Sequence, residues 1–396
     1  MKLSGGPQFL CTPGPTTVPD EVLRAMHRPA LDIYAGELIE TTNQCLERLK
    51  AIFKTQGRTY IYISNGHGAW EAALSNTLSR GDKVLVLESG RFALQWAEMA
   101  EQIGIEIEVL KGDWRRAVDV MAVEKRLRED HRGTIKAVLV VQVDTASAVV
   151  NDIPGIRKAM DRAGSRALYM VDAIASLATM PFEMDEWGVD VAVAATQKGL
   201  MMTPGLGLVA SGPRAWEAHK AAGLRTTYWD WTFRDGPLHY QKYCGTPPVH
   251  LIVGLARALD LIFEQTLETI FGRHRVLASA VHAAVEAWSI GGVIGFNVEH
   301  PAERAPSVTT ILMNGRDPEA IRKLCHEQCN VILGHGVGAL ARTSFRIAHM
   351  GHTNAPMILA TLATTEAAFR ALDVPCGKGI DAATAAIARA LRSTSA

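Results

Sequence analysis

The sequence predicts an α/β protein with two parts: a large domain on a mostly parallel sheet flanked by helices, and a smaller α+β domain. Up to about Ala210, short runs of Val, Ile and Leu alternate with helical patterns. Such uninterrupted apolar runs indicate strands buried on both faces, as in parallel sheets. From Val249 onward the pattern changes to long helical stretches. The length of 396 residues also exceeds what one ordinary core organises, so a second domain is expected.

The elements expected in the large domain alternate along the chain. Strands are expected at 59–63, 83–87, 105–109, 137–141 and 168–171, in the apolar run after Asp190, and at 207–210. Helices are expected at 68–78, 92–103, 118–130 and 153–163. Parallel sheets of this kind place their chemistry at the carboxyl ends of the strands. Polar residues that directly follow these strands are therefore the first candidates for a site.

The second part begins with a helical stretch from 249 to about 288, with a break expected near Thr266. The elements expected after it are a strand at 308–313, a helix at 318–329, a strand at 344–348, a helix at 356–372 and a short helix after Gly377. Pro356 suits the first position of its helix, where the missing N–H costs nothing. These patterns predict an amino-terminal segment 1–20, a large domain 21–248, and a linking helix with the small domain at 249–396.

The charge balance limits the partners. Lys and Arg total 41, as do Asp and Glu, which argues against a nucleic-acid groove or an anionic membrane surface. No apolar run reaches the roughly 18 residues that span a bilayer, and the amino terminus has neither a signal core nor a transit pattern. We expect a cytoplasmic protein. The six cysteines form no disulfide framework, and Cys325 with Cys329 lies in a helical pattern, so no metal site is expected.

Two residues at the ends of successive strands carry the main chemical signal. Asp172 follows the apolar run 168–171, and Lys198 ends the segment that begins at Asp190. A lysine amine can form an imine with a carbonyl cofactor, and a carboxylate can keep the pyridine nitrogen of that cofactor protonated. The pair therefore predicts a pyridoxal-phosphate enzyme.

Further features fall where such a site requires them. The loop Asn65-Gly66-His67-Gly68 lies between a strand and a helix, where backbone amides can bind a phosphate. Phe92 stands at the next crossing and suits stacking on a pyridine ring, although a lone Phe is more often part of a core. The segment 243–248, with Tyr243 and Thr246, is a polar loop or a plain turn. Arg346 is a charge inside an apolar strand, which fits either a carboxylate clamp or an internal salt bridge.

Together these motifs resemble the class V aminotransferases of fold-type I, specifically the serine–glyoxylate/alanine–glyoxylate aminotransferase family. The resemblance runs from Thr12-Pro-Gly-Pro-Thr16 to the segment 346–351, and Tyr228-Trp-Asp-Trp231 is similar to the serine–glyoxylate branch. It implies a large domain with a seven-stranded type of sheet and a smaller carboxyl-terminal domain. It also implies a homodimer.

The resemblance assigns roles to individual residues. Lys198 would carry pyridoxal 5'-phosphate and Asp172 would pair with its ring nitrogen. Arg346 would bind the substrate carboxylate, with Pro13 and Gly14 on the substrate side. The implied cofactor-binding residues are Asn65, Gly66, His67, Phe92, Thr145, Asp172, Gln197, Lys198, Tyr243 and Thr246. Of these, Tyr243 and Thr246 would reach the phosphate in the neighbouring subunit.

Three segments depart from the family pattern. The first loop reads Asn65-Gly-His-Gly, the segment 145–149 lacks the glycine usual before its valine, and Arg342-Thr343 replaces the frequent Gly-Lys. These changes bear on the substrate rather than on the catalytic core.

The function expected is amino transfer from serine or alanine to glyoxylate or pyruvate by a ping-pong mechanism. One alternative is another class V enzyme, such as an aspartate–glyoxylate or aminophosphonate–pyruvate transaminase, a lyase or a desulfurase. A more distant alternative is an NAD-dependent dehydrogenase, although the chain lacks the G-x-G-x-x-G pattern after its first strand.

Overall fold

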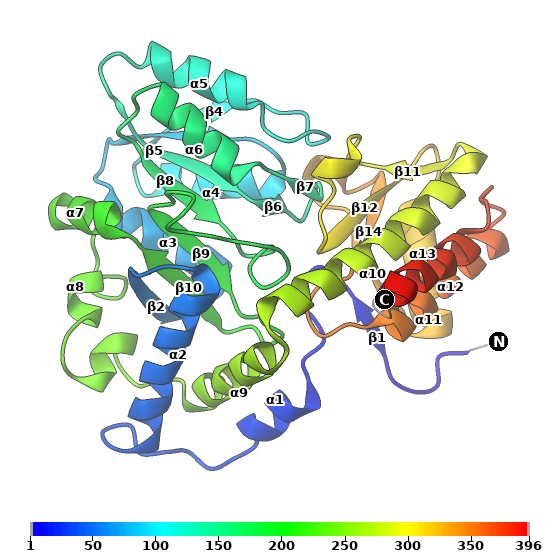
Figure 1. Ribbon diagram of the computed structural model, residues 1–396, viewed down its shortest axis with the longest axis horizontal. Coiled ribbons are helices and arrows are strands. Elements are labelled where there is room, and N and C mark those ends of the chain that lie inside the picture. The colour runs from blue at the N-terminus through cyan, green and yellow to red at the C-terminus, as the bar shows by residue number, and fades with distance from the viewer. Residues whose placement is uncertain (1–2, 394–396) are drawn as a thin grey trace.

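The computed structural model describes residues 3–393. Its two larger sheets lie side by side (Figure 1), and a small third sheet pairs β6 Val143–Asp144 with β7 Val149–Val150. The larger sheet has seven strands in the order β2-β10-β9-β8-β5-β3-β4. Their bounds are β2 Arg58–Ile63, β3 Lys83–Leu87, β4 Glu106–Leu110, β5 Ile135–Val141, β8 Leu168–Asp172, β9 Val191–Ala195 and β10 Leu206–Ser211. β10 is antiparallel to both of its neighbours, and the pairs among β4, β3, β5, β8 and β9 are parallel. The mostly parallel sheet expected from the sequence is confirmed.

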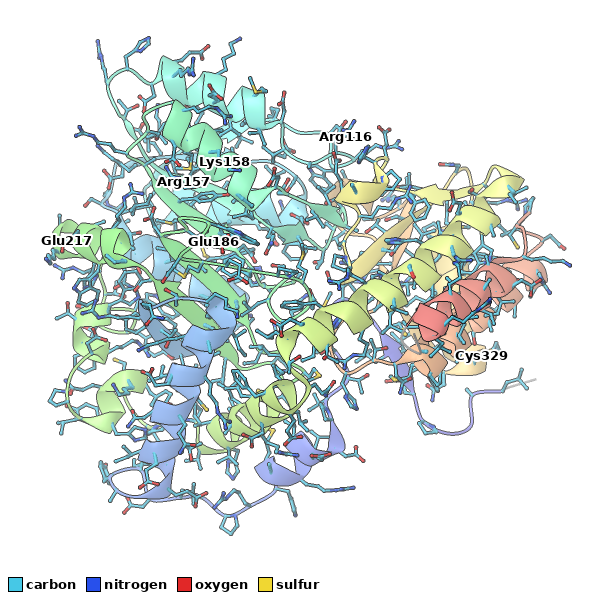
Figure 2. The ribbon with its side chains drawn as sticks, in the orientation of Figure 1. Arg116, Arg157, Lys158, Glu186, Glu217 and Cys329 are labelled. Carbon is cyan, nitrogen blue, oxygen red and sulfur yellow. The ribbon has the colours of Figure 1, made fainter. Side chains whose placement is uncertain are left out.

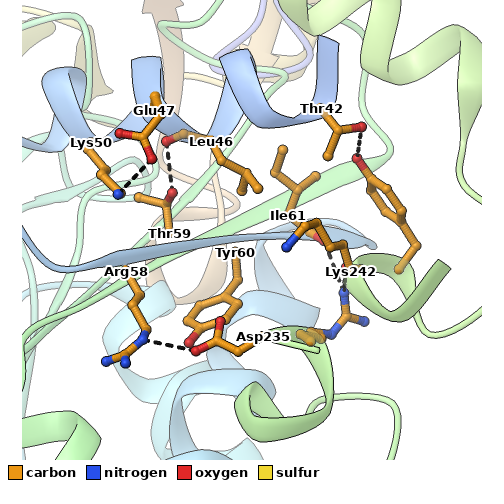
Figure 3. A pocket seen from close by; sticks show the side chains of 12 residues that line it. Thr42, Leu46, Glu47, Lys50, Arg58, Thr59, Tyr60, Ile61, Asp235 and Lys242 are labelled. Atoms are coloured by element: carbon orange, nitrogen blue, oxygen red, sulfur yellow. Dashed lines mark hydrogen bonds and ion pairs between the residues drawn. The ribbon is translucent and has the colours of Figure 1, made fainter. Parts of the chain in front are cut away.

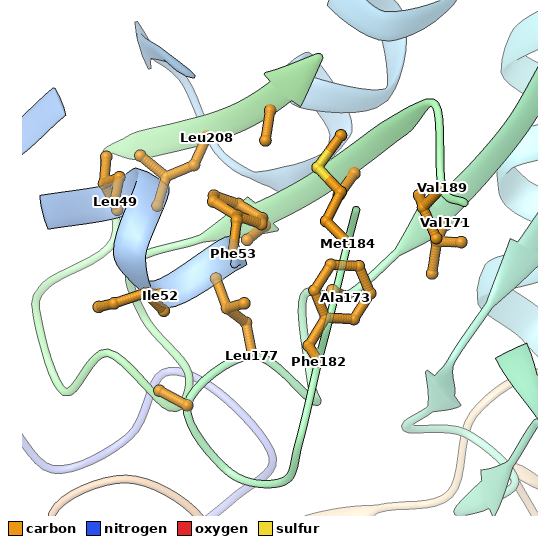
Figure 4. Close-up of a cluster of buried hydrophobic side chains, with 14 of the residues drawn as sticks. Leu49, Ile52, Phe53, Val171, Ala173, Leu177, Phe182, Met184, Val189 and Leu208 are labelled. Atoms are coloured by element: carbon orange, nitrogen blue, oxygen red, sulfur yellow. The ribbon is translucent and has the colours of Figure 1, made fainter. Parts of the chain in front are cut away.

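Helices cover both faces of this sheet, because its strands are apolar on both sides. The helices that contribute to the core on one face are α2 Glu37–Phe53, α5 Val120–Glu129, α6 Ile153–Arg162 and α9 Val249–Gln265. Those on the other face are α3 Gly66–Thr77, α4 Arg91–Gln102 and α7 Pro213–Ala221. Figure 4 shows part of the first core, where Leu49 and Phe53 of α2 pack with Leu208 of β10. These two cores, one on each face, fix the positions of the strands of the large sheet and therefore of the loops that follow the strands.

The smaller sheet has five strands in the order β1-β13-β14-β12-β11. Their bounds are β1 Phe9–Cys11, β11 Ile294–Phe296, β12 Val308–Met313, β13 Val331–His335 and β14 Ser344–Ala348. α11 Pro318–Cys329 and α12 Ala355–Ala371 pack beside it, and α13 Gly379–Ser393 packs against α12. β1 joins this sheet by parallel pairing with β13, so the amino-terminal segment belongs structurally with the carboxyl-terminal part.

One helix connects the two parts. α10 Leu267–Trp288 has residues in the core of the large sheet near its start, and residues in the core of the small sheet further along (Figure 1). The break expected near Thr266 is confirmed. Thr266 adopts φ +67°, and its hydroxyl accepts a hydrogen bond from the backbone N–H of Thr269, which caps α10.

Several boundaries differ from the sequence prediction. The last helix, expected to be short, has 15 residues. The helix expected from residue 118 begins at Val120, because Asp119 is its N-cap and accepts the N–H of Met121. Among residues 3–393, no helix combines the length and the apolar character that a membrane crossing requires.

Candidate active site

One cavity of about 310 Å³ collects the predicted site residues at the carboxyl edge of the large sheet. Asp172 is the last residue of β8, Lys198 follows β9, and Asn65 follows β2. Arg346 reaches the cavity from β14 of the small sheet. The predicted residues that line it are Pro13, Gly14, Asn65, Gly66, His67, Phe92, Thr145, Asp172, Gln197, Lys198 and Arg346. Tyr243 and Thr246 are not among the lining residues.

Lys198 has an amine that loses its proton readily. Burial and the positive charge of Arg346 lower its pKa to about 8, although Asp172 opposes this shift. The Nζ atom donates a hydrogen bond to the carbonyl oxygen of Pro13. Gly14 makes this approach possible, because it adopts φ +99° and a Cβ there would lie 2.6 Å from Nζ. The segment Pro13–Gly14 therefore fixes where the free amine lies.

Asp172 is a buried carboxyl group with two donors. The indole Nε1 of Trp70 donates to Oδ2 at 2.8 Å, and the backbone N–H of Ile174 donates to Oδ1 at 2.7 Å. Burial raises the pKa of Asp172 to about 7, and the two hydrogen bonds oppose that rise. Trp70 was not predicted from the sequence; its position four residues after Gly66 on a helix is the signal that places both on one face.

The loop after β2 forms the amino terminus of α3. The side chain of Asn65 is the N-cap, accepting the N–H groups of His67 at 3.0 Å and Gly68 at 3.4 Å. A Cβ at Gly66 would collide with the side chain of Ile174, so glycine allows the close packing of this loop. The helix has no acidic side chain in its first turn, and its dipole favours an anion there.

Arg346 is held by backbone carbonyls rather than by a carboxylate. Its Nε donates to the oxygen of His335 at 2.7 Å, and Nη1 donates to the oxygen of Thr145 at 2.7 Å. Among residues 3–393, Nη2 makes no hydrogen bond. The guanidinium is buried, and burial lowers its pKa to about 10. Of the two interpretations offered by the sequence, this geometry favours a group that binds an external carboxylate.

Asp144 lies behind two residues that line the cavity, Phe92 and Thr145, and it was not predicted from the sequence. Its Oδ2 accepts the backbone N–H groups of Phe92 at 2.8 Å and Ala93 at 3.1 Å, at the start of α4. Its Oδ1 accepts the N–H of Ala146 at 2.9 Å. This buried carboxyl group therefore joins Phe92 to the loop that carries Thr145. Its position directly before Thr145 is the only sequence signal.

A family model described as Aminotransferase class-V matches residues 9–354. The chain belongs to the class V aminotransferases. The family resemblance inferred from the motifs is thereby confirmed, and the protein is a transaminase.

Two relatives of known activity are similar to this chain over nearly its whole length. The chain is 37% identical over 389 residues to the serine–glyoxylate aminotransferase of Methylorubrum extorquens, covering 96% of this chain and 95% of that protein. It is 36% identical over 386 residues to the L-aspartate–glyoxylate aminotransferase of Paracoccus denitrificans, with 96% of each chain covered.

Solved structures confirm the fold-type I architecture. The ureidoglycine–glyoxylate aminotransferase of Bacillus subtilis superposes with a TM-score of 0.88 at 25% identity, covering 98% of this chain and 99% of that one. The pyridoxamine–pyruvate aminotransferase of Mesorhizobium loti superposes with a TM-score of 0.89 at 26% identity, covering 98% and 100%.

The class V aminotransferase family implies pyridoxal phosphate, and the cavity fits this group. The Oε1 atom of Gln197 is buried and finds no hydrogen-bond partner among residues 3–393. A buried polar atom in such a position indicates that a ligand completes the site. The amino terminus of α3 suits the phosphate, Asp172 suits the pyridine nitrogen, and Lys198 suits the aldehyde carbon.

Tyr243 lies outside the cavity of this class V enzyme. Its side chain is buried, and its hydroxyl group lies 2.9 Å from Oγ1 of Thr42 on α2. Thr246, three residues later, is exposed. Of the two residues that the family resemblance assigns to the cofactor of a neighbouring subunit, Thr246 is exposed on the surface and Tyr243 is buried.

Tyr243 contributes instead to a separate pocket of about 130 Å³ between α2, β2 and the segment 234–243 (Figure 3). Two pairs of charged groups there contact each other. Lys50 donates to Glu47 at 2.7 Å, and Arg58 forms an ion pair with Asp235 at 2.9 Å. The carboxylate of Asp235, which lines this pocket, is partly exposed, in contrast to the buried Asp172 of the cavity around Lys198.

Proposed function

We propose that this class V aminotransferase uses pyridoxal 5'-phosphate to transfer an amino group from a small α-amino acid, serine or alanine, to glyoxylate or pyruvate. The single observation that carries the proposal is one cavity in which the Lys198 amine, the Asp172 carboxylate and the Arg346 guanidinium face a common space. These three groups match an aldehyde, a pyridine nitrogen and a substrate carboxylate, respectively.

When bound, the cofactor supplies an electron-withdrawing ring that acidifies the Cα–H bond of an attached amino acid. In its ionised form, Asp172 would hold the proton on the pyridine nitrogen, and the low dielectric around this buried group would strengthen that pairing. The Lys198 amine then takes the Cα proton as a general base and returns it as a general acid. Its pKa of about 8 leaves a useful fraction of neutral amine near neutral pH.

The remaining residues bind and orient. The N–H groups at the start of α3 would hold the phosphate, Gln197 would lie beside the phosphate and the ring, and Phe92 would stack on the ring. Thr145, which lines the cavity, would offer its hydroxyl to the phenolic oxygen of the cofactor. Arg346 grips the α-carboxylate in a planar two-point contact, which fixes the Cα–H bond within reach of Lys198.

The lining of the cavity favours a small donor. Within residues 3–393 its cationic side chains are Lys198 and Arg346, with the imidazole of His67, and the other lining groups include Pro13, Gly14, Ala175 and Pro204. A dicarboxylic donor such as aspartate needs a second cation for its side-chain carboxylate. The relatives include both serine and aspartate enzymes, and this lining supports serine or alanine.

A panel of amino donors against keto-acid acceptors tests the proposal. The purified protein should show visible absorbance that borohydride removes, and peptide mapping should place the reduced adduct on Lys198. Serine or alanine with glyoxylate should give glycine. An adduct on another lysine, or no amino transfer from any donor, would overturn the assignment.

The alternatives are not favoured. A desulfurase needs a reactive cysteine near the substrate. Cys325 is buried in α11, where burial raises its pKa to about 12, and Cys329 lies on the same helix in the smaller part of the molecule (Figure 2). Neither lines the cavity. Substrate-dependent release of sulfide would reverse this conclusion.

We further propose a homodimer, with Thr246 and, after rearrangement, Tyr243 directed to the phosphate site of the neighbouring subunit. The exposure of Thr246 supports this role. A cytoplasmic location is consistent with the six free cysteines, because oxidising compartments favour disulfides. We also propose that the amino-terminal segment ends at residue 20, and that the large domain ends at residue 248.

A further inference from the structure

Trp70 forms part of the wall of the proposed cofactor site. It lies on α3, is 1% exposed and lines the cavity. Its ring meets His67 edge-on, with centroids 4.6 Å apart, and Phe92 at a tilt, with centroids 6.5 Å apart. Trp70 therefore packs between the loop expected to hold the phosphate and the aromatic ring expected to cover the cofactor.

The indole N–H of Trp70 has a specific partner. It donates to Oδ2 of Asp172 at 2.8 Å, while Ile174 donates its backbone N–H to Oδ1 at 2.7 Å. The two donors contact different oxygens and so fix the plane of the carboxyl group. An ionised carboxylate has about four lone-pair positions, so it can still accept a pyridinium N–H.

The charge state of Asp172 depends on this hydrogen bond. Burial favours the neutral carboxyl group, and the buried carboxyl group of Asp144 adds to that tendency. The amine of Lys198 and the two N–H donors favour the charged form. Because these effects oppose each other, the loss of the indole donor moves the balance toward the neutral form.

We propose that Trp70 is a positioning residue for the transamination site: its indole N–H orients the Asp172 carboxyl group and keeps it ionised toward the pyridine nitrogen of the cofactor. The proposal rests on the proposed function, because it requires pyridoxal phosphate in the cavity. It assigns to Trp70 a role beyond filling space, which a phenylalanine would fill nearly as well.

Trp96 provides a matched control. It lies on α4, is fully buried, and stacks on Trp70 with centroids 5.9 Å apart and planes 15° from parallel. Within residues 3–393, its Nε1 has no hydrogen-bond partner. Trp96→Phe therefore removes an equally buried indole from the same stack without removing a hydrogen bond. It measures the effect of packing alone.

Equilibrium dialysis of the cofactor-free protein against pyridoxamine 5'-phosphate, the amine form of the cofactor, over a pH series gives the test without any turnover and without an imine to Lys198. Wild-type affinity should fall as the pH drops through the pKa of Asp172. Trp70→Phe should move the midpoint of that fall upward by about one pH unit, the size of one lost charge-stabilising hydrogen bond. Trp96→Phe should leave the midpoint unchanged. In an Asp172→Asn background, Trp70→Phe should change the affinity no more than Trp96→Phe does.

The outcomes separate the two proposals. A wild-type protein that binds no pyridoxamine 5'-phosphate overturns the proposed function. A wild-type protein that binds it, while Trp70→Phe keeps the wild-type midpoint, overturns the role of Trp70 alone. If Trp70→Phe does not fold, benzothienylalanine at position 70 keeps the shape of the ring and lacks the N–H. The same upward shift is then expected, and its absence counts against the proposal.

Discussion

At the scale of single residues, we expect Arg346→Lys to weaken substrate binding, although it keeps the positive charge. Arg346→Lys keeps the positive charge but loses the planar fork, and the donors to His335 and Thr145 are lost with it. We expect weaker binding of serine, alanine and glyoxylate by about 1.5–3 kcal/mol, the scale of a hydrogen bond to a charged group. Spectral titration of substrate binding measures this loss.

An amine without a carboxylate is the control for Arg346→Lys. Its binding should change little, and the spectrum of the bound cofactor should stay the same. Equal losses for the amine and the amino acids would mean that Arg346 supports the cavity wall rather than the substrate.

Lys198 should show its low pKa in the capture of the cofactor. The neutral amine attacks the aldehyde, and the pKa of about 8 means that this form is lost as the pH falls below 8. In cofactor-free protein, the rate of attachment should therefore rise with pH and level off above about pH 8. Stopped-flow absorbance follows the reaction. Arg346→Gln removes a positive charge that lowers this pKa, so the plateau should move to higher pH; an unshifted plateau would contradict the assigned cause.

Ala148 stands at the position where the family resemblance implies a glycine, and its backbone conformation is one that favours glycine. It adopts φ +67°, a region that costs an alanine roughly 1–2 kcal/mol. Ala148→Gly relieves this strain, which offsets the loss of a buried methyl group. The nearby Ala146, also buried, lacks this strain. We expect Ala146→Gly to lose about 1–2 kcal/mol more unfolding free energy than Ala148→Gly in denaturant titrations. Equal losses would show that Ala148 is not strained.

At the scale of secondary-structure elements, Asp144 ties the start of α4 to the loop of Thr145. Asp144→Asn keeps the shape but replaces one acceptor oxygen by a donor, which then faces a backbone N–H. We expect a loss of about 1–3 kcal/mol in unfolding free energy, the cost of a buried unsatisfied donor. Asp152→Asn is the control, because Asp152 is an exposed N-cap of α6 and asparagine caps equally well. Similar losses for both variants would refute the assignment.

The sequence predicted the elements with continuous apolar runs and the residues that follow them. Lys198 and Asp172 were found in this way, because strand ends are visible as polar residues after apolar runs. Trp70 and Asp144 were not found, since their roles depend on hydrogen bonds between segments 102 and 52 residues apart. β1 was not found either, because its three residues gain their strand pairing only from β13. Tertiary contacts of this kind leave no local pattern.

At the scale of the whole molecule, the site lies between two sheets. Asp172 and Lys198 belong to the large sheet and the loop after β9, whereas Arg346 belongs to β14 of the small sheet, and Pro13 follows β1 of the same sheet. α10 contributes to the cores of both parts and so fixes their spacing. A substrate held by Arg346 and reached by Lys198 therefore bridges the two parts of the chain.

The proposed dimer adds a second subunit to this arrangement, and mixed dimers test it. One protein carries Lys198→Ala. The other carries Thr246→Ala with Tyr243→Phe, which keeps the buried ring of Tyr243 in place. If the loop serves the neighbouring subunit, the purified heterodimer has one site with every group intact, because the two-fold symmetry exchanges loops between the sites. Its activity should recover to about half of the wild-type dimer. A heterodimer of Lys198→Ala with Arg346→Ala is the control and should stay inactive, since both residues line the cavity of their own chain. If the heterodimer of the Lys198→Ala protein with the Tyr243→Phe, Thr246→Ala protein is no more active than the two parent homodimers, the loop that carries Tyr243 and Thr246 serves the site of its own subunit.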